Sequence, residues 1–140
     1  MNVMSMVQVL SSAIAMGTSF AVSAAALPIY HCDYRVVRDG NSLEMNGDID
    51  AAEATTPPNG STYLTLEPIR ASGIDVTARV LITYWTDNGD YYYNPMTLHR
   101  RGDSSEILAS ALLNGTEQQL TYEDSETNTA YSLSCKVKQK

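Results

Sequence analysis

The sequence predicts an all-β protein, a small antiparallel β-barrel or β-sandwich of seven to eight strands. Apolar and polar residues alternate with a period of two through most of the chain after residue 27, which is typical of strands with one face in the core and one in water. Residue pairs that accept a positive φ separate these runs, as expected of tight turns. Two cysteines, Cys32 and Cys135, occupy inward positions of the first and last runs. We therefore expect the two ends of the domain to lie close together.

The alternating runs define the expected strands in chain order. Their inward positions are Tyr30, Cys32, Tyr34 and Val36, then Leu43, Met45 and Ile49, then Leu64 and Leu66, then Val76, Ala78, Val80, Ile82 and Tyr84, and finally Tyr131, Leu133, Cys135 and Val137. Turn residues are supplied by Asp39-Gly40, Asn46-Gly47, Asn59-Gly60, Asn88-Gly89 and Asn114-Gly115. The pattern predicts a meander without internal repeats or a second domain.

The segment 104–113 fits two kinds of element. Asp103-Ser104-Ser105-Glu106 resembles a capping box, and the apolar residues between Ile107 and Leu112 would share one helical face. Read as a strand, the segment points Ile107, Ala109, Ala111 and Leu113 inward and leads into a hairpin turn at Asn114-Gly115. We expect the strand, because a hairpin fits the surrounding meander, and keep a short helix as the alternative.

Residues 1–26 are predicted to be a signal peptide that precedes a single β domain at 27–140. The segment Val7–Val22 is uncharged, and small residues from Ser23 to Ala26 provide a cleavage site. A membrane anchor is the alternative, since about 20 apolar residues can span a bilayer. Polar residues interrupt this run, so we expect cleavage, export to the periplasm or the extracellular space, and no stable membrane insertion afterwards.

Export would place both cysteines in an oxidising compartment, where a pair most simply forms a disulfide. A bond between Cys32 and Cys135 would close nearly the whole mature chain into one loop. We predict a structural disulfide that joins the first and last strands, because redox-active pairs usually show a close spacing such as C-x-x-C.

Few residues of this chain suit catalysis or metal binding. Only two histidines are present, His31 and His99, and both are expected on the surface. No serine lies in a nucleophile-elbow motif, and the acidic turns lack the ligand spacing of a calcium loop. Zinc needs three or four ligands, which two histidines cannot supply once the cysteines are oxidised. The sequence therefore predicts no catalytic residues, no metal and no cofactor.

One hairpin carries the strongest indication of a binding surface. A two-residue turn at Asn88-Gly89 would pair Trp85 with Tyr92 and Leu81 with Met96, on the face that meets water. The opposite side of the hairpin, which continues the core face, would carry Tyr84 and Tyr93. Exposed Trp, Tyr, Leu and Met side chains are typical of contact surfaces. We therefore predict a binding patch formed by Leu81, Trp85, Tyr92 and Met96.

The net charge of the chain limits the kinds of partner that we expect. The chain has 16 acidic and 9 basic residues and a net charge of −7, which disfavours nucleic acid and suits a basic partner. The leading hypothesis is an exported, non-catalytic protein that binds a protein or glycan, such as an inhibitor of a basic secreted enzyme. One alternative is a carbohydrate-binding module or small hydrolase that uses Trp85 and Tyr91–Tyr93. Another is a structural subunit that assembles through an unpaired edge strand.

Overall fold

The fold is an all-β sandwich, seen in a computed structural model that describes residues 27–55, 60–68, 73–85, 91–101 and 106–138. The predicted signal peptide at 1–26 lies outside these residues. In chain order the elements are β2 (Ile29–Arg38), β3 (Asn41–Asp50), the 3-10 helix η1 (Ala51–Thr55), β4 (Ser61–Leu66), β5 (Val76–Trp85), β6 (Tyr91–Tyr93), β7 (Pro95–Arg100), β8 (Ile107–Leu112), β9 (Glu117–Asp124) and β10 (Thr129–Val137). Among the described residues, no helix has the length and hydropathy to cross a bilayer.

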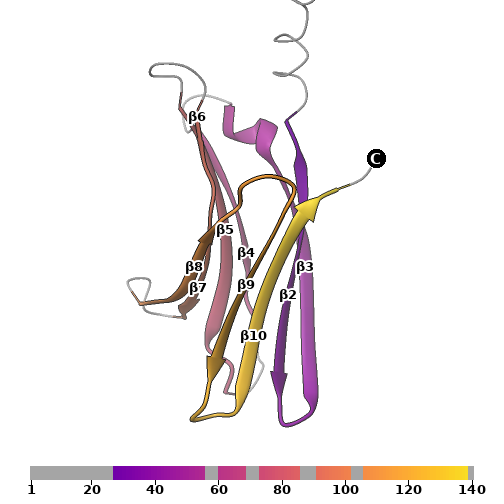
Figure 1. Ribbon diagram of the computed structural model, residues 1–140, viewed down its shortest axis with the longest axis vertical. Helices are drawn as coiled ribbons and strands as arrows, with labels where there is room; N and C mark the ends of the chain where they lie inside the picture. The colour runs from indigo at the N-terminus through magenta and orange to yellow at the C-terminus, as the bar shows by residue number, and fades with distance from the viewer. Residues whose placement is uncertain (1–26, 56–59, 69–72, 86–90, 102–105, 139–140) are drawn as a thin grey trace, which may run out of the picture.

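Two antiparallel sheets pack face to face (Figure 1). One sheet has the strand order β3-β2-β10-β9, and the other has the order β4-β5-β7-β8 with β6 also paired to β5. β6 and β7 share one register along β5, since Thr83 pairs with Tyr93 and Val80 pairs with Met96. They therefore act as one strand interrupted near Pro95, whose ring nitrogen cannot donate to the ladder. The sandwich is one of the two architectures that the sequence predicts.

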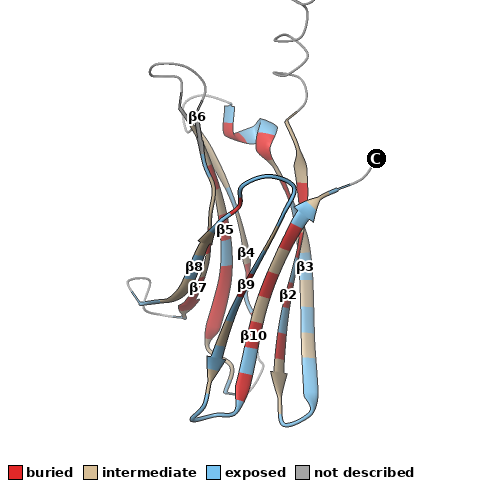
Figure 2. Cartoon of the chain, in the orientation of Figure 1, coloured by how far each residue is buried: buried red, intermediate tan, exposed pale blue. Residues whose placement is uncertain are grey.

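The core lies between the sheets and follows the predicted alternation. Buried and exposed positions alternate along β10 and β2 (Figure 2). The fully buried side chains include Tyr34, Ile82, Leu98 and Leu133. Tyr34 also links the two sheets, because its hydroxyl donates a 2.6 Å hydrogen bond to the carbonyl oxygen of Val76. Burial raises the pKa of the Tyr34 phenol well above its ordinary value, so this group stays a donor.

The predicted disulfide is confirmed and lies inside one sheet. Cys32 on β2 is directly opposite Cys135 on β10, and the two residues are bonded and fully buried. The ends of the domain therefore meet side by side as neighbouring strands, not across the sandwich.

Residues 107–112 form β8, which confirms the predicted strand and not the alternative helix. The direction of Ile107 was predicted wrongly. The β7–β8 ladder is irregular at Leu98/His99, where Leu98 pairs with Ala109 but His99 pairs with Ile107. The extra residue reverses the alternation at the start of β8, and Ile107 is 56% exposed while Leu113 is buried.

Asn46-Gly47 is not a turn but part of β3, where Gly47 lies opposite Cys32. A Cβ atom at Gly47 would lie 2.9 Å from Leu64 Cδ1 on β4. Gly47 thus lets β3 and β4, the edge strands of the two sheets, approach each other closely. Close approach of another strand is a common reason for a glycine inside a strand.

Candidate functional site

The outer surface of the β4-β5-β7-β8 sheet is nearly free of charge. Its outward positions alternate with the core-facing ones along each strand, and most of them belong to threonine, serine, tyrosine and aliphatic residues. In the described strands they are Ser61, Tyr63, Thr65, Thr77, Arg79, Leu81, Thr83, Tyr93, Pro95, Thr97, His99, Ile107, Ser110 and Leu112. Arg79 is the one formally charged residue in this set. We call this surface the tyrosine face.

An apolar row crosses the tyrosine face from edge to edge. Tyr63 on β4 lies opposite Leu81 on β5, and Pro95 on β7 lies opposite Leu112 on β8. Val80 pairs with Met96 in the antiparallel ladder; Leu81 follows Val80 and Pro95 precedes Met96, so Leu81 and Pro95 are neighbours in the same row. Tyr63 is 67% exposed and Leu112 is 44% exposed, and Tyr93, two residues before Pro95, is 41% exposed. Large apolar side chains therefore meet water across the width of the sheet.

Arg79 lies beside this row and contacts its most exposed member. The Arg79 guanidinium carbon is 5.8 Å from the centre of the Tyr63 ring, a distance typical of a cation–π contact. Within the part of the chain that the structure describes, Arg79 forms no ion pair. The Arg79 guanidinium is thus held against an aromatic ring, and no described carboxylate neutralises its charge.

The predicted binding patch is only partly found on this face. The structure pairs Tyr84 with Tyr92 and Trp85 with Tyr91, so the hairpin register differs by one residue from the predicted one. Residues 86–90 separate the last pair, and this odd number replaces the two-residue loop that was expected. A slip of one residue exchanges the two faces of a strand.

Met96 is the clearest correction. It lies opposite Val80 and is fully buried in the core, so it cannot belong to a surface patch. Leu81 does lie on the outward face, half-buried. Tyr93, expected in the core, is exposed instead. The side chains of Trp85, Tyr91 and Tyr92 lie outside the described residues.

Sequence reasoning missed Tyr63, Leu112 and Tyr93. Tyr63 could have been found from the sequence. Leu64 and Leu66 were recognised as inward positions, and Tyr63, which directly precedes Leu64, must then point outward. The outward position of Leu112 followed from the predicted strand, but its pairing with Pro95 did not, and Tyr93 required the true loop length. Only the structure supplies those two facts.

The outer surface of the other sheet is strongly charged. It presents Asp33, Arg35, Glu44 and Lys136, and it carries an ion-pair cluster around His31 near the start of β2. His31 Nδ1 is 2.7 Å from Asp48 Oδ1, and Lys138 Nζ is 2.6 Å from Asp48 Oδ2. The hydrogen bond with Asp48 raises the pKa of His31, helped by the charge of Asp33 and opposed by slight burial. The two outer surfaces of the sandwich therefore differ sharply in charge.

His31 is expected to titrate above its ordinary value of 6.5. Because the folded pKa is raised, the protonated histidine stabilises the fold fully below pH 6.5, and this contribution is lost as pH rises through the folded pKa. NMR titration of the two imidazoles, assigned with a His31→Gln variant, measures the midpoint. Asp48→Asn should return the midpoint toward 6.5, and an unchanged midpoint in that variant would refute the assigned cause.

His99 differs from the expectation of a surface histidine. It lies opposite Thr77 on the outward side of the sheet, yet it is only 9% exposed. Neither ring nitrogen has a hydrogen-bond partner in the described structure. Across those same residues, no group of three His, Cys, Asp or Glu side chains is placed to hold a metal ion.

No protein-family model, curated protein or solved structure matches this chain. The function is therefore argued from the geometry of the sandwich and the composition of its surfaces.

Proposed function

We propose that this protein is an exported, non-catalytic binding protein that holds a protein partner against the tyrosine face. One observation carries the proposal. In a chain of net charge −7, the outward positions of β4, β5, β6, β7 and β8 that the structure describes carry one formal charge, that of Arg79. Solvated sheet faces usually carry many charges, whereas the centres of protein interfaces are depleted of charge and enriched in Tyr and Arg.

The arrangement of the side chains supports the same function. Tyr63 and Tyr93 offer large surfaces with few rotatable bonds, and Leu81, Pro95 and Leu112 extend the apolar area between and beyond them. Rigid aromatic side chains and arginine supply much of the binding energy at known interfaces. Asp33, Glu44 and Asp48 lie on the opposite sheet, so their attraction of a basic partner would act at long range and not within the contact.

Photo-crosslinking tests this proposal. A benzoylphenylalanine at position 63 should capture one protein from the native envelope or secreted fraction, and the same probe at Glu44, on the charged outer surface, should not. With the captured protein purified, Tyr63→Ser should weaken binding by roughly 30-fold, as expected for an aromatic anchor at the centre of an interface. Thr121→Ser on β9, which lies in the other sheet, is the control and should bind normally.

Two outcomes would overturn it. Equal crosslinking from both outer surfaces, or a captured protein whose affinity is unchanged by Tyr63→Ser, would remove the tyrosine face from the contact. Saturable binding to a glycan panel that is lost in Tyr63→Ser, without protein capture, would favour the carbohydrate-binding module instead.

A further inference from the structure

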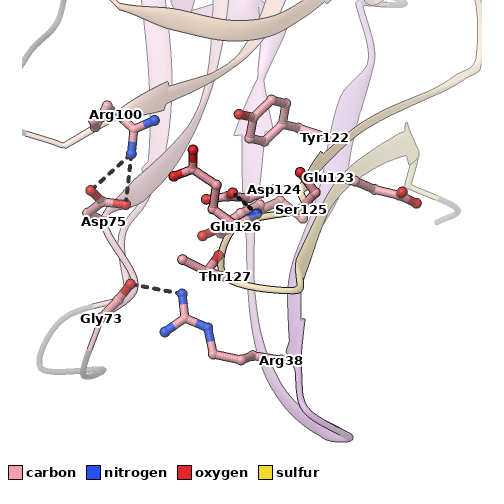
Figure 3. Close-up of a pocket in the computed structure, with 11 residues that line it drawn as sticks. Arg38, Gly73, Asp75, Arg100, Tyr122, Glu123, Asp124, Ser125, Glu126 and Thr127 are labelled. Carbon is pink, nitrogen blue, oxygen red and sulfur yellow. Dashed lines mark hydrogen bonds and ion pairs between the residues drawn. The ribbon is translucent and has the colours of Figure 1, made fainter.

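A polar cleft of about 510 Å³ opens at the end of the sandwich where β2 and β9 end (Figure 3). Its walls come from both sheets. Arg38 and the β9–β10 turn, including Glu126, belong to one sheet, and Gly73, Asp75 and Arg100 belong to the other side. The volume lies in the range of small-molecule sites in proteins. The cleft lies at one end of β5 and β7, several residues along each strand from the apolar row of the tyrosine face.

Most of the charges in the cleft already have partners. Arg100 is held by Asp75, with an Nη1–Oδ2 distance of 3.2 Å, and by Glu106, with an Nε–Oε1 distance of 3.1 Å. Asp124 Oδ1 accepts a 3.0 Å hydrogen bond from the backbone N–H of Glu126. Figure 3 shows the Glu123 side chain pointing away from the other labelled residues.

Arg38 is a fixed cation without an anionic partner. Its Nε donates to Thr129 Oγ1 at 2.6 Å, and its Nη2 donates to the carbonyl oxygen of Gly73 at 3.0 Å. Both acceptors are neutral, and Arg38 makes no ion pair with any carboxylate that the structure describes. A Cβ atom at Gly73, whose φ is +75°, would lie 2.6 Å from Arg38 Nη1. The glycine therefore makes room for the guanidinium at the wall of the cleft.

Glu126 is the corresponding anion. Its carboxylate extends from the β9–β10 turn toward the side of the cleft formed by Asp75 and Arg100 (Figure 3). Its side chain has no hydrogen bond or ion pair with other described residues. The half-buried ring of Tyr122 lines the same cleft and stacks on Tyr131, with 6.1 Å between the ring centres. The cleft thus offers one unpaired cation, one unpaired anion and an aromatic wall.

We propose that this cleft binds a small zwitterion with a carboxylate at one end and a cation at the other, such as a basic amino acid or a peptide that ends in one. The ligand carboxylate pairs with the guanidinium of Arg38, and the ligand cation pairs with Glu126 beside Tyr122. Charge-assisted pairs of this kind are the strong polar contacts of proteins, and a cation is also stabilised over an aromatic ring. Each end of the ligand neutralises a charge that the fold leaves uncompensated.

Three probes of nearly equal size test the two ends separately by NMR titration or calorimetry. L-Arginine carries both charges, L-arginine methyl ester lacks the carboxylate, and L-citrulline lacks the side-chain cation. We expect saturable binding of L-arginine and at least about tenfold weaker binding of the other two, since losing one charge-assisted pair costs that much or more. The dipeptide Gly-Arg, titrated alongside, separates the two sources, because tighter binding than L-arginine would indicate a peptide end.

Two variants then test which residue binds each end of the ligand. Glu126→Gln should abolish the preference for L-arginine over L-citrulline, and Arg38→Gln should abolish the preference for L-arginine over its methyl ester. Because Arg38 also anchors Thr129 and Gly73, Arg38→Lys serves as a second variant that keeps the charge and should keep part of the preference. The controls are Glu117→Gln and Arg35→Gln, on strands β9 and β2 but outside the cleft, and both should bind as the parent does. Absence of saturable binding, equal binding of the three probes, or preferences that survive both cleft variants would overturn the proposal.

Discussion

Reduction of the Cys32–Cys135 disulfide should lower the free energy of unfolding by about 4 to 5 kcal/mol. The bond joins residues 103 positions apart, so it closes nearly all of the described chain into one loop. In the chain-entropy model a loop of this size removes about that much free energy from the unfolded ensemble. Small domains have only about 5–15 kcal/mol in total, so the reduced protein is expected to be marginal.

Urea unfolding of residues 27–140 with and without a reducing agent measures this loss. The native ladder between β2 and β10 does not depend on the bond, because Tyr34, Val36 and their partners on β10 pair along the same register. The reduced protein should therefore keep its folded spectrum while its midpoint falls. Adding the reducing agent to a Cys32→Ala, Cys135→Ala double variant should change nothing. A loss below about 1 kcal/mol would mean that the unfolded chain is already compact without the bond.

The central strands could be predicted from sequence because their signal is local. In the middle of β2 and β10, inward residues such as Tyr34 and Leu133 lie between two polar neighbours, and both cysteines share the inward parity, from which the disulfide was predicted. The strand at 107–112 was also predicted, but the hairpin turn expected at Asn114-Gly115 was wrong. β8 and β9 belong to different sheets, so residues 113–116 carry the chain from one sheet to the other, and Gly115 adopts a φ of +86° within this connection.

The candidate sites depend on features that no local pattern contains. The outward or inward direction of Met96 and Tyr93 follows from the number of residues in the loop after Trp85, and one residue more or less exchanges the faces. The direction of Ile107 depends on an irregularity in its pairing with β7.

The end cleft is a property of the tertiary fold alone. Arg38, Asp75, Arg100 and Glu126 are spread over most of the chain after residue 27 and meet because the two sheets end at the same place. None of these residues belongs to a recognisable motif. Their surroundings, and not their identities, distinguish them from solvated charges elsewhere on the chain.

Leu133→Ala on β10 should lower the free energy of unfolding by about 3 kcal/mol. Leu133 is fully buried in the middle of β10 and lies between Tyr34 on β2 and Leu120 on β9. Truncating a buried leucine removes apolar contacts and leaves a cavity, which costs about 2–5 kcal/mol. The rigid ladder on both sides limits the collapse that could fill the space.

Ser132→Ala is the matched control, because Ser132 precedes Leu133 on the same strand and lies on the opposite face. Its replacement should change the free energy of unfolding by less than about 0.5 kcal/mol, as most surface substitutions do. Urea unfolding of both variants with the disulfide intact gives the comparison, since the cross-link keeps the unfolded state alike in the two proteins. Similar losses in the two variants would contradict the assignment of faces along β10. The same alternation determines which residues point outward on both sheets. The result would therefore also contradict the assignment of one charged outer surface and one tyrosine face.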